Sequence, residues 1–437
     1  MNFFRRMSSA PFVIFNGLVV MSLVVIYLIG IFKTSILFYI IVLVMVLILI
    51  ASQIYQIYMI KENKILDDFA EFLISMDNSI SNVFKQYFKN SKEEKFILQM
   101  GDVYYKTAFS EKHIGKILKE FNRFGLSKYS IFIMLLERAL FFYLKVIENN
   151  PKSYLANLQI ANIYYYINHF REAKKYYTAT INATTDNIDS NNSKVFYYRG
   201  LCNRQLNDLK SAHEDLSMAI FLDPGNTDAY QIRGLIDYAN HEYVKAIENF
   251  KNYLKQSPND TEILFFKGAS ESYLKKYDEA INSFSKAIEI NPNYVDALKD
   301  RALVYYRLEK YDLGLMDIDK SISIDPNNFH NYFVRGMIYA AQDRVLDAVF
   351  EFARAVEIDP KVSETYYELA KLASKLNKTE EAISQLDKAI EKNPYYIQAL
   401  ELRGNLKIAS GDIEGGKKDL DSVSEFRVNN FYDITVN

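Results

Sequence analysis

The chain has 437 residues, of which 52 are Lys or Arg and 54 are Asp or Glu, so its formal charge at pH 7 is −2. Because the charges nearly balance and no strongly basic tract occurs, the composition argues against nucleic acid as a partner. The single cysteine, Cys202, excludes an internal disulfide framework and a zinc site built from several thiolates.

The first sixty residues predict a transmembrane helical hairpin. No charged residue occurs for 26 residues after Arg6, or for 27 residues after Lys33. A helix of about 20 apolar residues crosses the hydrocarbon core of a bilayer, so each stretch is long enough to span it. We therefore expect membrane helices at about 11–32 and 35–59. One very long helix would bury Lys33, and a cleavable signal peptide would not be followed by a second apolar run.

Flanking charge predicts the orientation of the hairpin. Arg5 and Arg6 precede the first apolar stretch, Lys61 and Lys64 follow the second, and the turn between them carries only Lys33. Since positive residues stay on the cytoplasmic side, we expect both termini and the rest of the chain to be cytoplasmic, with the opposite topology as the alternative. The absence of Trp and the abundance of Tyr, Phe, Ile, Asn and Lys favour a bacterial source, and hence an inner membrane.

Residues 61–151 are expected to form a helical junction. Apolar residues recur at helical spacing from Ile65 to Tyr87. The favoured role of this helix is to cover the first unit of a repeat array that follows, because a terminal repeat leaves one apolar side without a neighbour. Packing along the membrane surface and pairing with a second copy of the chain are the alternatives.

The rest of the chain is organised by prolines at a fixed spacing. Proline cannot continue a helix and pushes the preceding residue out of helical geometry, so a proline period is a helix-stop period. This period indicates a repeat architecture. Seven repeats run from Ser193 to Asn430, and an eighth covers 154–187, where the polar segment 186–192 predicts a surface loop. The prolines spaced by 34 residues are Pro224, Pro258, Pro292, Pro326, Pro360 and Pro394, with Pro151 before them.

Other positions also recur when this proline is numbered 32. Positions 8 and 20 are small, position 27 is usually small, and position 24 is large and apolar. Two small residues on either side of a short turn suit helices that cross closely, and the large residue fills the space beside them. Position 8 is Gly200, Gly234, Gly268, Ala302, Gly336, Ala370 and Gly404, and position 24 is Leu216, Phe250, Phe284, Ile318, Phe352, Leu386 and Leu420.

This pattern resembles the tetratricopeptide repeat, in which position 8 is small, positions 20 and 27 are alanine, position 24 is aromatic and position 32 is proline. The resemblance implies an all-α fold, a right-handed α-solenoid of about eight to nine helix pairs over 152–430 with a C-terminal tail at 431–437. A degenerate first pair is split. Residues around Gly101 resemble a first helix, Glu137–Pro151 resembles a second, and the insertion at 110–130 is expected to add another helix.

Position 7 departs from the family pattern because it is usually basic rather than apolar. Arg at position 7 occurs with an acid at position 23 in four repeats, and the repeat with Leu369 at position 7 has the neutral Gln385 at position 23. A half-buried Arg needs a charged partner, because an unpaired buried charge is costly. We therefore predict an ion pair inside each of these repeats that holds its two helices together.

The resemblance also implies a concave groove lined by positions 2, 5, 9, 12 and 13 of the first helices. Exposed aromatic surface in a concavity is typical of a partner site, although some of these side chains could simply pack against neighbouring helices. A carboxylate clamp is not supported, since Lys299 at position 5 accompanies Leu303 at position 9. The predicted partner-binding residues, called the groove set below, are Tyr165, Tyr197, Leu201, Leu235, Tyr238, Phe265, Tyr273, Leu303, Tyr306, Phe333, Met337 and Tyr367.

The sequence carries no recognisable catalytic, cofactor or metal motif. Its five histidines are scattered, and it has no HExxH, glycine-rich phosphate loop or nucleophile elbow. We therefore expect no enzyme activity and no cofactor. The leading hypothesis is a scaffold anchored in the bilayer through residues 11–59, which recruits proteins or peptide segments through the groove. The alternative is a regulatory or assembly subunit of a membrane enzyme, transporter or secretion complex, contacting it through the hairpin.

Overall fold

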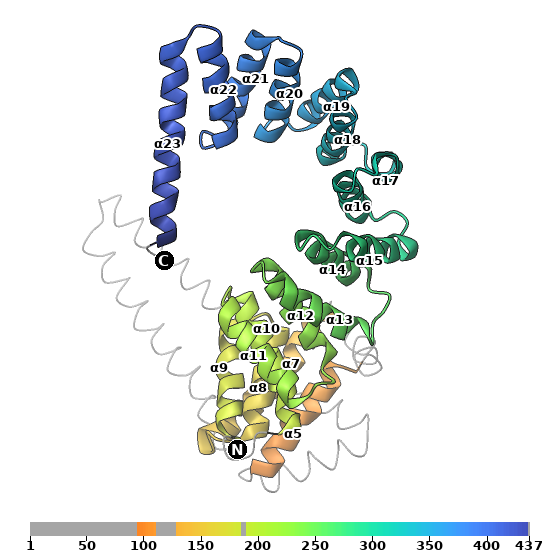
Figure 1. The fold of residues 1–437 in the computed structure, drawn as a ribbon. Coiled ribbons are helices and arrows are strands. Elements are labelled where there is room, and N and C mark those ends of the chain that lie inside the picture. The colour runs from red at the N-terminus through yellow and green to blue at the C-terminus, as the bar shows by residue number, and fades with distance from the viewer. Residues whose placement is uncertain (1–93, 111–127, 185–188, 436–437) are drawn as a thin grey trace, which may run out of the picture. The chain divides into compact units, whose positions relative to one another are not determined.

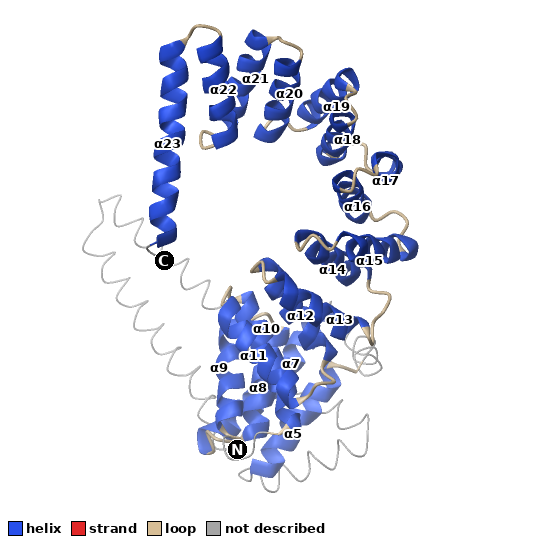
Figure 2. Ribbon diagram, viewed as in Figure 1, coloured by secondary structure: helices blue, strands red, loops and turns tan. Residues whose placement is uncertain are grey.

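The computed structural model describes residues 94–110, 128–184 and 189–435. Figure 2 shows this part of the chain as helices joined by loops, without a strand. Its elements are α5 (Glu94–Ala108), α7 (Lys128–Asn149), α8 (Tyr154–Tyr166), α9 (Phe170–Asn182), the 3-10 turn η2 (Ser190–Asn192), α10 (Ser193–Gln205), α11 (Leu209–Leu222), α12 (Thr227–Ala239), α13 (Tyr243–Leu254), α14 (Thr261–Tyr273), α15 (Tyr277–Ile290), α16 (Val295–Arg307), α17 (Tyr311–Ile324), α18 (Phe329–Ala341), α19 (Val345–Ile358), α20 (Ser363–Lys375), α21 (Thr379–Lys392), α22 (Ile397–Ala409) and α23 (Ile413–Thr435).

The described residues divide into two compact units, with the boundary between Gln159 and Ile160. In the first unit, α5 and α7 pack against each other as a helix pair. Tyr143 of α7 is fully buried against Gly101 of α5, and its hydroxyl donates a hydrogen bond of 2.7 Å to Asp102. The glycine lets the ring approach the backbone of α5, so this pair has the same small-against-large contact as the repeats of the second unit.

The second unit is a run of helix pairs in which each helix from α9 to α23 packs against the next one along the chain (Figure 1). The pairs follow the 34-residue period, with first helices α10, α12, α14, α16, α18, α20 and α22. In addition, α12, α14 and α16 each contact the next first helix in the series, which are α14, α16 and α18. The structure is therefore the helix-pair solenoid that the proline spacing indicated.

Glycine at position 8 is explained by the ring at position 24. In three repeats a Cβ on this glycine would lie less than 3 Å from a phenylalanine ring: 2.7 Å for Gly234 and Phe250, 2.9 Å for Gly268 and Phe284, and 2.8 Å for Gly336 and Phe352. The three rings are fully buried. Where position 24 is Ile318 or Leu386 instead, position 8 is alanine, although the repeats with Leu216 and Leu420 keep glycine there. A smaller residue at position 24 therefore permits a Cβ at position 8 but does not require one.

Each turn between paired helices from α8 to α23 passes through the left-handed backbone region at position 15. Seven of these turns carry a residue other than glycine there, with φ between 58° and 62°. This conformation reverses the chain in a few residues but is unfavourable for residues that have a Cβ. The seven residues are Asn168, Asn207, His241, Lys275, Glu309, Asp343 and Asn377, and Gly411 occupies the eighth turn.

The C-terminal end differs from the expectation of a tail at 431–437, because α23 continues to Thr435. The reason is that position 32 of the last repeat is Val428, so no proline ends the helix. None of the helices in the described ranges is long and apolar enough to cross a membrane. The predicted hairpin at 11–59, the capping helix before residue 94 and most of the insertion at 110–130 lie outside these ranges.

Candidate functional site

The predicted ion pairs are present in all four repeats that combine Arg at position 7 with an acid at position 23. Arg301 makes a bidentate contact with Asp317, with Nη2 to Oδ1 at 2.6 Å and Nε to Oδ2 at 2.7 Å. The two side chains are only 17% and 10% exposed, so each needs the other. The remaining pairs are Arg199–Asp215 at 2.6 Å, Arg335–Glu351 at 2.9 Å and Arg403–Asp419 at 2.6 Å. The prediction of an intra-repeat pair is confirmed.

The same arginines also contact position 25 of the preceding repeat, which the sequence reasoning missed. Arg301 Nη1, for example, donates to Ser285 Oγ at 2.8 Å. Position 25 is a hydroxyl or an acid wherever position 7 is Arg, and that correlation was the available signal. We call this arrangement the arginine ladder. Its other inter-repeat bonds are Arg199–Thr178 at 3.3 Å, Arg233–Ser217 at 3.1 Å, Arg335–Asp319 at 2.7 Å and Arg403–Asp387 at 2.6 Å.

The electrostatics of the ladder favour a structural role. Burial alone would lower the pKa of the Arg301 guanidinium, but the hydrogen bond and charge of Asp317 outweigh burial, and the pKa is raised. Burial raises the pKa of Glu351 even though the hydrogen bond from Arg335 opposes that shift. Apart from Nε of Arg335, which is buried without a hydrogen-bond partner, the donors and acceptors of these pairs bond within the protein, so the ladder joins helices and repeats rather than presenting free charges to a ligand.

All twelve members of the groove set lie on first helices, from Tyr165 on α8 to Tyr367 on α20. Eleven are half-buried and Tyr273 is 62% exposed. Because α12, α14, α16 and α18 contact one another in order, the eight members on these helices form one row. Eight of the twelve pack with one side against a buried core cluster, namely Leu235, Tyr238, Phe265, Leu303, Tyr306, Phe333, Met337 and Tyr367.

Aromatic rings beyond the groove set extend this surface. Tyr273 stacks on Tyr243 with ring centroids 4.6 Å apart and an interplanar angle of 6°, and Tyr238 lies 5.8 Å from Tyr243. Phe265 contacts Tyr294, at the last position of its own repeat, with centroids 5.4 Å apart. The sequence reasoning considered only first-helix positions and so missed Tyr243 and Tyr294, which lie in or beside the second helix and the inter-repeat turn.

The tyrosines of this surface act as neutral hydrogen-bonding groups. Burial is the main cause that raises the pKa of Tyr238 and of Tyr294 to about 12, and neighbouring acidic groups add to the effect. Burial likewise raises the pKa of Tyr165 and Tyr197. Their hydroxyls therefore stay protonated at neutral pH and can donate hydrogen bonds to a partner's carbonyls while the rings supply apolar contact area.

The acidic, histidine and cysteine side chains of the described residues do not gather into a metal-binding group. Across 94–110, 128–184 and 189–435, no group of three or more His, Cys, Asp and Glu side chains could hold a metal ion. Cys202 is buried, and burial raises the pKa of its thiol to about 12, which disfavours the reactive thiolate. His213 is engaged with Asp237 at 2.9 Å. The arrangement can bind and position a partner through surface contacts.

Together, the paired helices, the fixed period and the packing of position 8 against position 24 define an all-α helix-pair repeat protein. Models of the tetratricopeptide repeat match this chain at residues 158–227, 271–309 and 351–384. These matched segments are similar to tetratricopeptide repeats. Repeats of this family bind proteins and peptides and are typically non-catalytic scaffolds. The comparison with curated proteins gave no match.

Similar solved structures include tetratricopeptide-repeat proteins. One from Parabacteroides merdae is 18% identical and covers 56% of this chain and 99% of its own, with a TM-score of 0.48. The C-terminal part of one from Cytophaga hutchinsonii is 17% identical, covering 59% and 98%, with a TM-score of 0.43. YrrB, described as having an unusual peptide-binding site, is 22% identical, covering 44% and 98%, with a TM-score of 0.35.

Proposed function

We propose that this chain is a membrane-anchored interaction scaffold that binds a segment of a partner protein along the groove set and recruits that partner to the cytoplasmic face of the membrane. The observation that carries the proposal is the row of half-exposed apolar and tyrosine side chains on α12, α14, α16 and α18. These residues already contact the core on one side, so the area they leave exposed is presented at a regular spacing along consecutive repeats.

The chemistry of this row favours an extended or helical segment with apolar side chains. Tyrosine and phenylalanine rings supply contact area, and the protonated hydroxyls supply donors for backbone carbonyls. A terminal carboxylate is not the recognised group, because Lys299 is engaged with Asp296 and Asp300 at 3.3 and 3.5 Å and its neighbour in the clamp pattern is Leu303.

The membrane part of the proposal rests on the sequence. The two uncharged stretches at 11–59 are long enough to span a bilayer, and the flanking Arg and Lys favour cytoplasmic termini. Tethering would raise the local concentration of the repeats near membrane partners, so that weak individual contacts suffice. Protease protection in spheroplasts tests the orientation, because a cytoplasmic repeat region is cleaved only after the inner membrane is opened.

The binding surface is tested with a triple variant, Tyr238→Ala, Phe265→Ala and Tyr306→Ala. Partners crosslinked to the full-length protein in native membranes are quantified by mass spectrometry. The expected result is a loss of at least about tenfold in the partners recovered, which corresponds to about 1.4 kcal/mol of binding free energy. Circular dichroism checks the fold of each variant. The single variant Tyr273→Ala changes the same surface at an exposed position. It is also expected to lower the amount of partner recovered.

The matched control removes three exposed aromatic side chains outside the groove set, with Phe221→Ala, Phe350→Ala and Tyr395→Ala, which are 78%, 70% and 71% exposed. This control is expected to retain the partners. Equal recovery from the wild type and the groove variant, with both folded, would refute the binding surface. Deletion of residues 1–60 distinguishes the proposal from the alternative, a subunit that contacts a membrane complex through the hairpin. A scaffold keeps its partners without the hairpin, whereas such a subunit loses them.

A further inference from the structure

The arginine ladder is interrupted at one junction between repeats. Where α13 meets α14, position 7 is Lys267 instead of Arg, and position 25 of the preceding repeat is Lys251 instead of a hydroxyl or an acid. Elsewhere in the ladder the residue at position 25 accepts a hydrogen bond from the cation at position 7. Here both positions carry an ammonium group. The hydrogen-bond acceptor that position 25 supplies in the ladder is therefore missing, and two positive charges are placed at the same junction.

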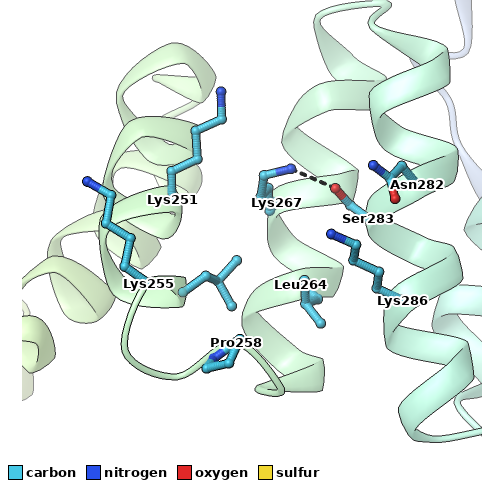
Figure 3. Close-up of a pocket in the computed structure, with 9 residues that line it drawn as sticks. Lys251, Lys255, Pro258, Leu264, Lys267, Asn282, Ser283 and Lys286 are labelled. Carbon is cyan, nitrogen blue, oxygen red and sulfur yellow. Dashed lines mark hydrogen bonds between the residues drawn. The ribbon is translucent and has the colours of Figure 1, made fainter.

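The same junction holds a cavity surrounded by lysines. It has a volume of about 250 Å³, and its nine lining residues include four lysines and no acid. Lys251 comes from α13, Lys255 from the turn directly after α13, Lys267 from α14 and Lys286 from α15. Figure 3 shows Lys286 pointing from α15 toward Lys267. Leu254, Leu264 and Pro258 supply the apolar part of the lining.

The pattern of charge is specific to this junction. Its cavity is built from positions 25 and 29 of one repeat and positions 7, 22, 23 and 26 of the next. At each of the other six junctions between repeats from residue 154 to 430, at least one of these six positions is Asp or Glu. At this junction four of the six are lysine and the other two are Asn282 and Ser283. The lysine excess is therefore a local departure from the repeat.

Two lysines of the cluster already have hydrogen-bond partners, because Lys255 donates to Asn252 Oδ1 at 2.7 Å and Lys267 is held at the cavity. Lys267 donates to Glu271 at 2.5 Å and to Ser283 at 2.7 Å, and Ser283 in turn donates to Glu271 at 2.6 Å. The Glu271 side chain is 3% exposed, so this carboxylate is enclosed beneath the lysine. A single buried carboxylate leaves the charge of Lys251, Lys255 and Lys286 uncompensated around the opening.

We propose that these four lysines form a binding site for a phosphate monoester dianion, at the place where the other junctions have an acceptor built into the chain. Lysine ammonium groups are compact point charges with rotatable donors, which suits a tetrahedral dianion, whereas a planar carboxylate is matched better by the fork of an arginine. The cavity is several times larger than the ~30 Å³ occupied by a water molecule. Its leucine and proline lining suits the carbon that carries an esterified phosphate.

The proposed site is separate from the groove set, with which it shares no residue. The phosphate group could come from a phosphorylated side chain of a partner or from a small phosphorylated molecule, and the chemistry at the lysines would be the same. The function of the groove does not depend on this site, so either proposal can fail while the other stands.

The test uses the full-length protein in mild detergent and titrates inorganic phosphate at constant ionic strength, with chloride as the reference anion. Isothermal calorimetry measures binding, and thermal unfolding measures stabilisation. The expected result is saturable binding of phosphate and none of chloride. N-acetyl-phosphoserine amide and glycerol phosphate are compared next. Tighter binding of the first by about tenfold assigns the site to phosphorylated residues, and equal binding assigns it to phosphate monoesters in general.

The decisive variant is Lys251→Asp, which restores the acid that Asp319 and Asp387 supply at other junctions. It is expected to weaken phosphate binding at least tenfold without lowering the unfolding temperature, since the new carboxylate pairs with Lys267. The control Lys210→Gln with Lys320→Gln removes two exposed lysines elsewhere and is expected to bind like the wild type. The proposal is overturned if phosphate does not bind saturably, if Lys251→Asp binds it as tightly, or if the control loses binding equally.

Discussion

Replacement of Gly336 by alanine sets two physical effects against each other. Gly336 lies in the interior of α18, where alanine is favoured over glycine by about 1 kcal/mol of helix propensity. A Cβ at this position would, however, lie 2.8 Å from Cε1 and 2.9 Å from Cδ1 of Phe352. Ordinary contacts are about 0.6 Å or more longer, and the Phe352 ring is fully buried and has no free space to enter.

The packing effect is expected to be the larger one. Overpacking a well-filled core costs about 1 to 3 kcal/mol, so Gly336→Ala should lower the free energy of unfolding by about 1 to 2 kcal/mol after the gain in propensity. Phe352→Leu alone should cost a similar amount because it leaves a cavity. The double variant reproduces the pair Ala370 and Leu386 of the next repeat. Its loss of unfolding free energy should therefore be smaller than the sum of the two single losses by about 1 kcal/mol or more.

Urea unfolding of the full-length protein in mild detergent, followed by circular dichroism, measures these differences. Hydrogen exchange of the α18 and α19 amides gives a local reading, since the stability of a repeat array is a sum of local terms. Gly200→Ala is the matched control, because its nearest side-chain atom is Cγ of Leu216 at 3.2 Å, an aliphatic group that can shift. If Gly336→Ala is as stable as the wild type or more so, the account of position 8 is wrong.

Three further results are expected from urea unfolding of the same protein. Arg301→Met should lower the free energy of unfolding by about 2 to 4 kcal/mol, because it leaves the buried Asp317 without its charged partner. Adding Asp317→Leu should recover part of that loss. Equal losses in the single and double variants would contradict the role of the pair. Burial alone would raise the pKa of Asp419, but hydrogen bonds from its arginine and lysine partners outweigh burial and lower it. The stability this group adds is therefore present above its ordinary pKa, about 3.9, and is lost as the pH falls further, so Asp419→Asn should flatten the acid limb of a stability–pH profile. Lys275→Gly and Glu309→Gly, at φ of 59° and 58°, should each raise stability by up to ~1 kcal/mol, and a loss would argue against strain at these turns.

The repeat and its internal contacts could be predicted from the sequence because they are periodic. Proline, glycine and a large apolar residue each recur at one position, and each has a local physical meaning: a helix stop, a close approach or a filled space. The pairing of Arg301 with Asp317 followed from the same register, since a buried guanidinium needs an acid nearby. These inferences needed only spacing along one repeat.

The contacts between repeats were harder to predict because they join positions from different periods. The bond from Arg301 to Ser285 links position 7 to position 25 of the preceding repeat, and a serine by itself gives no sign of such a partner. Likewise, the stacking of Tyr243 on Tyr273 joins a second helix to the first helix of the next repeat. The lysine cavity of α13, α14 and α15 could be recognised only once the ladder it interrupts was visible.

The sequence by itself determined the helix-pair repeat, its boundaries and the residues of its core, because each of these depends on short-range geometry that recurs every 34 residues. The tertiary structure decided how neighbouring repeats are joined, which tyrosines contact one another and where uncompensated charge gathers around a cavity. Those features depend on side chains brought together from different repeats, and the distance between such groups is set by the packing of whole helices rather than by their spacing along the chain.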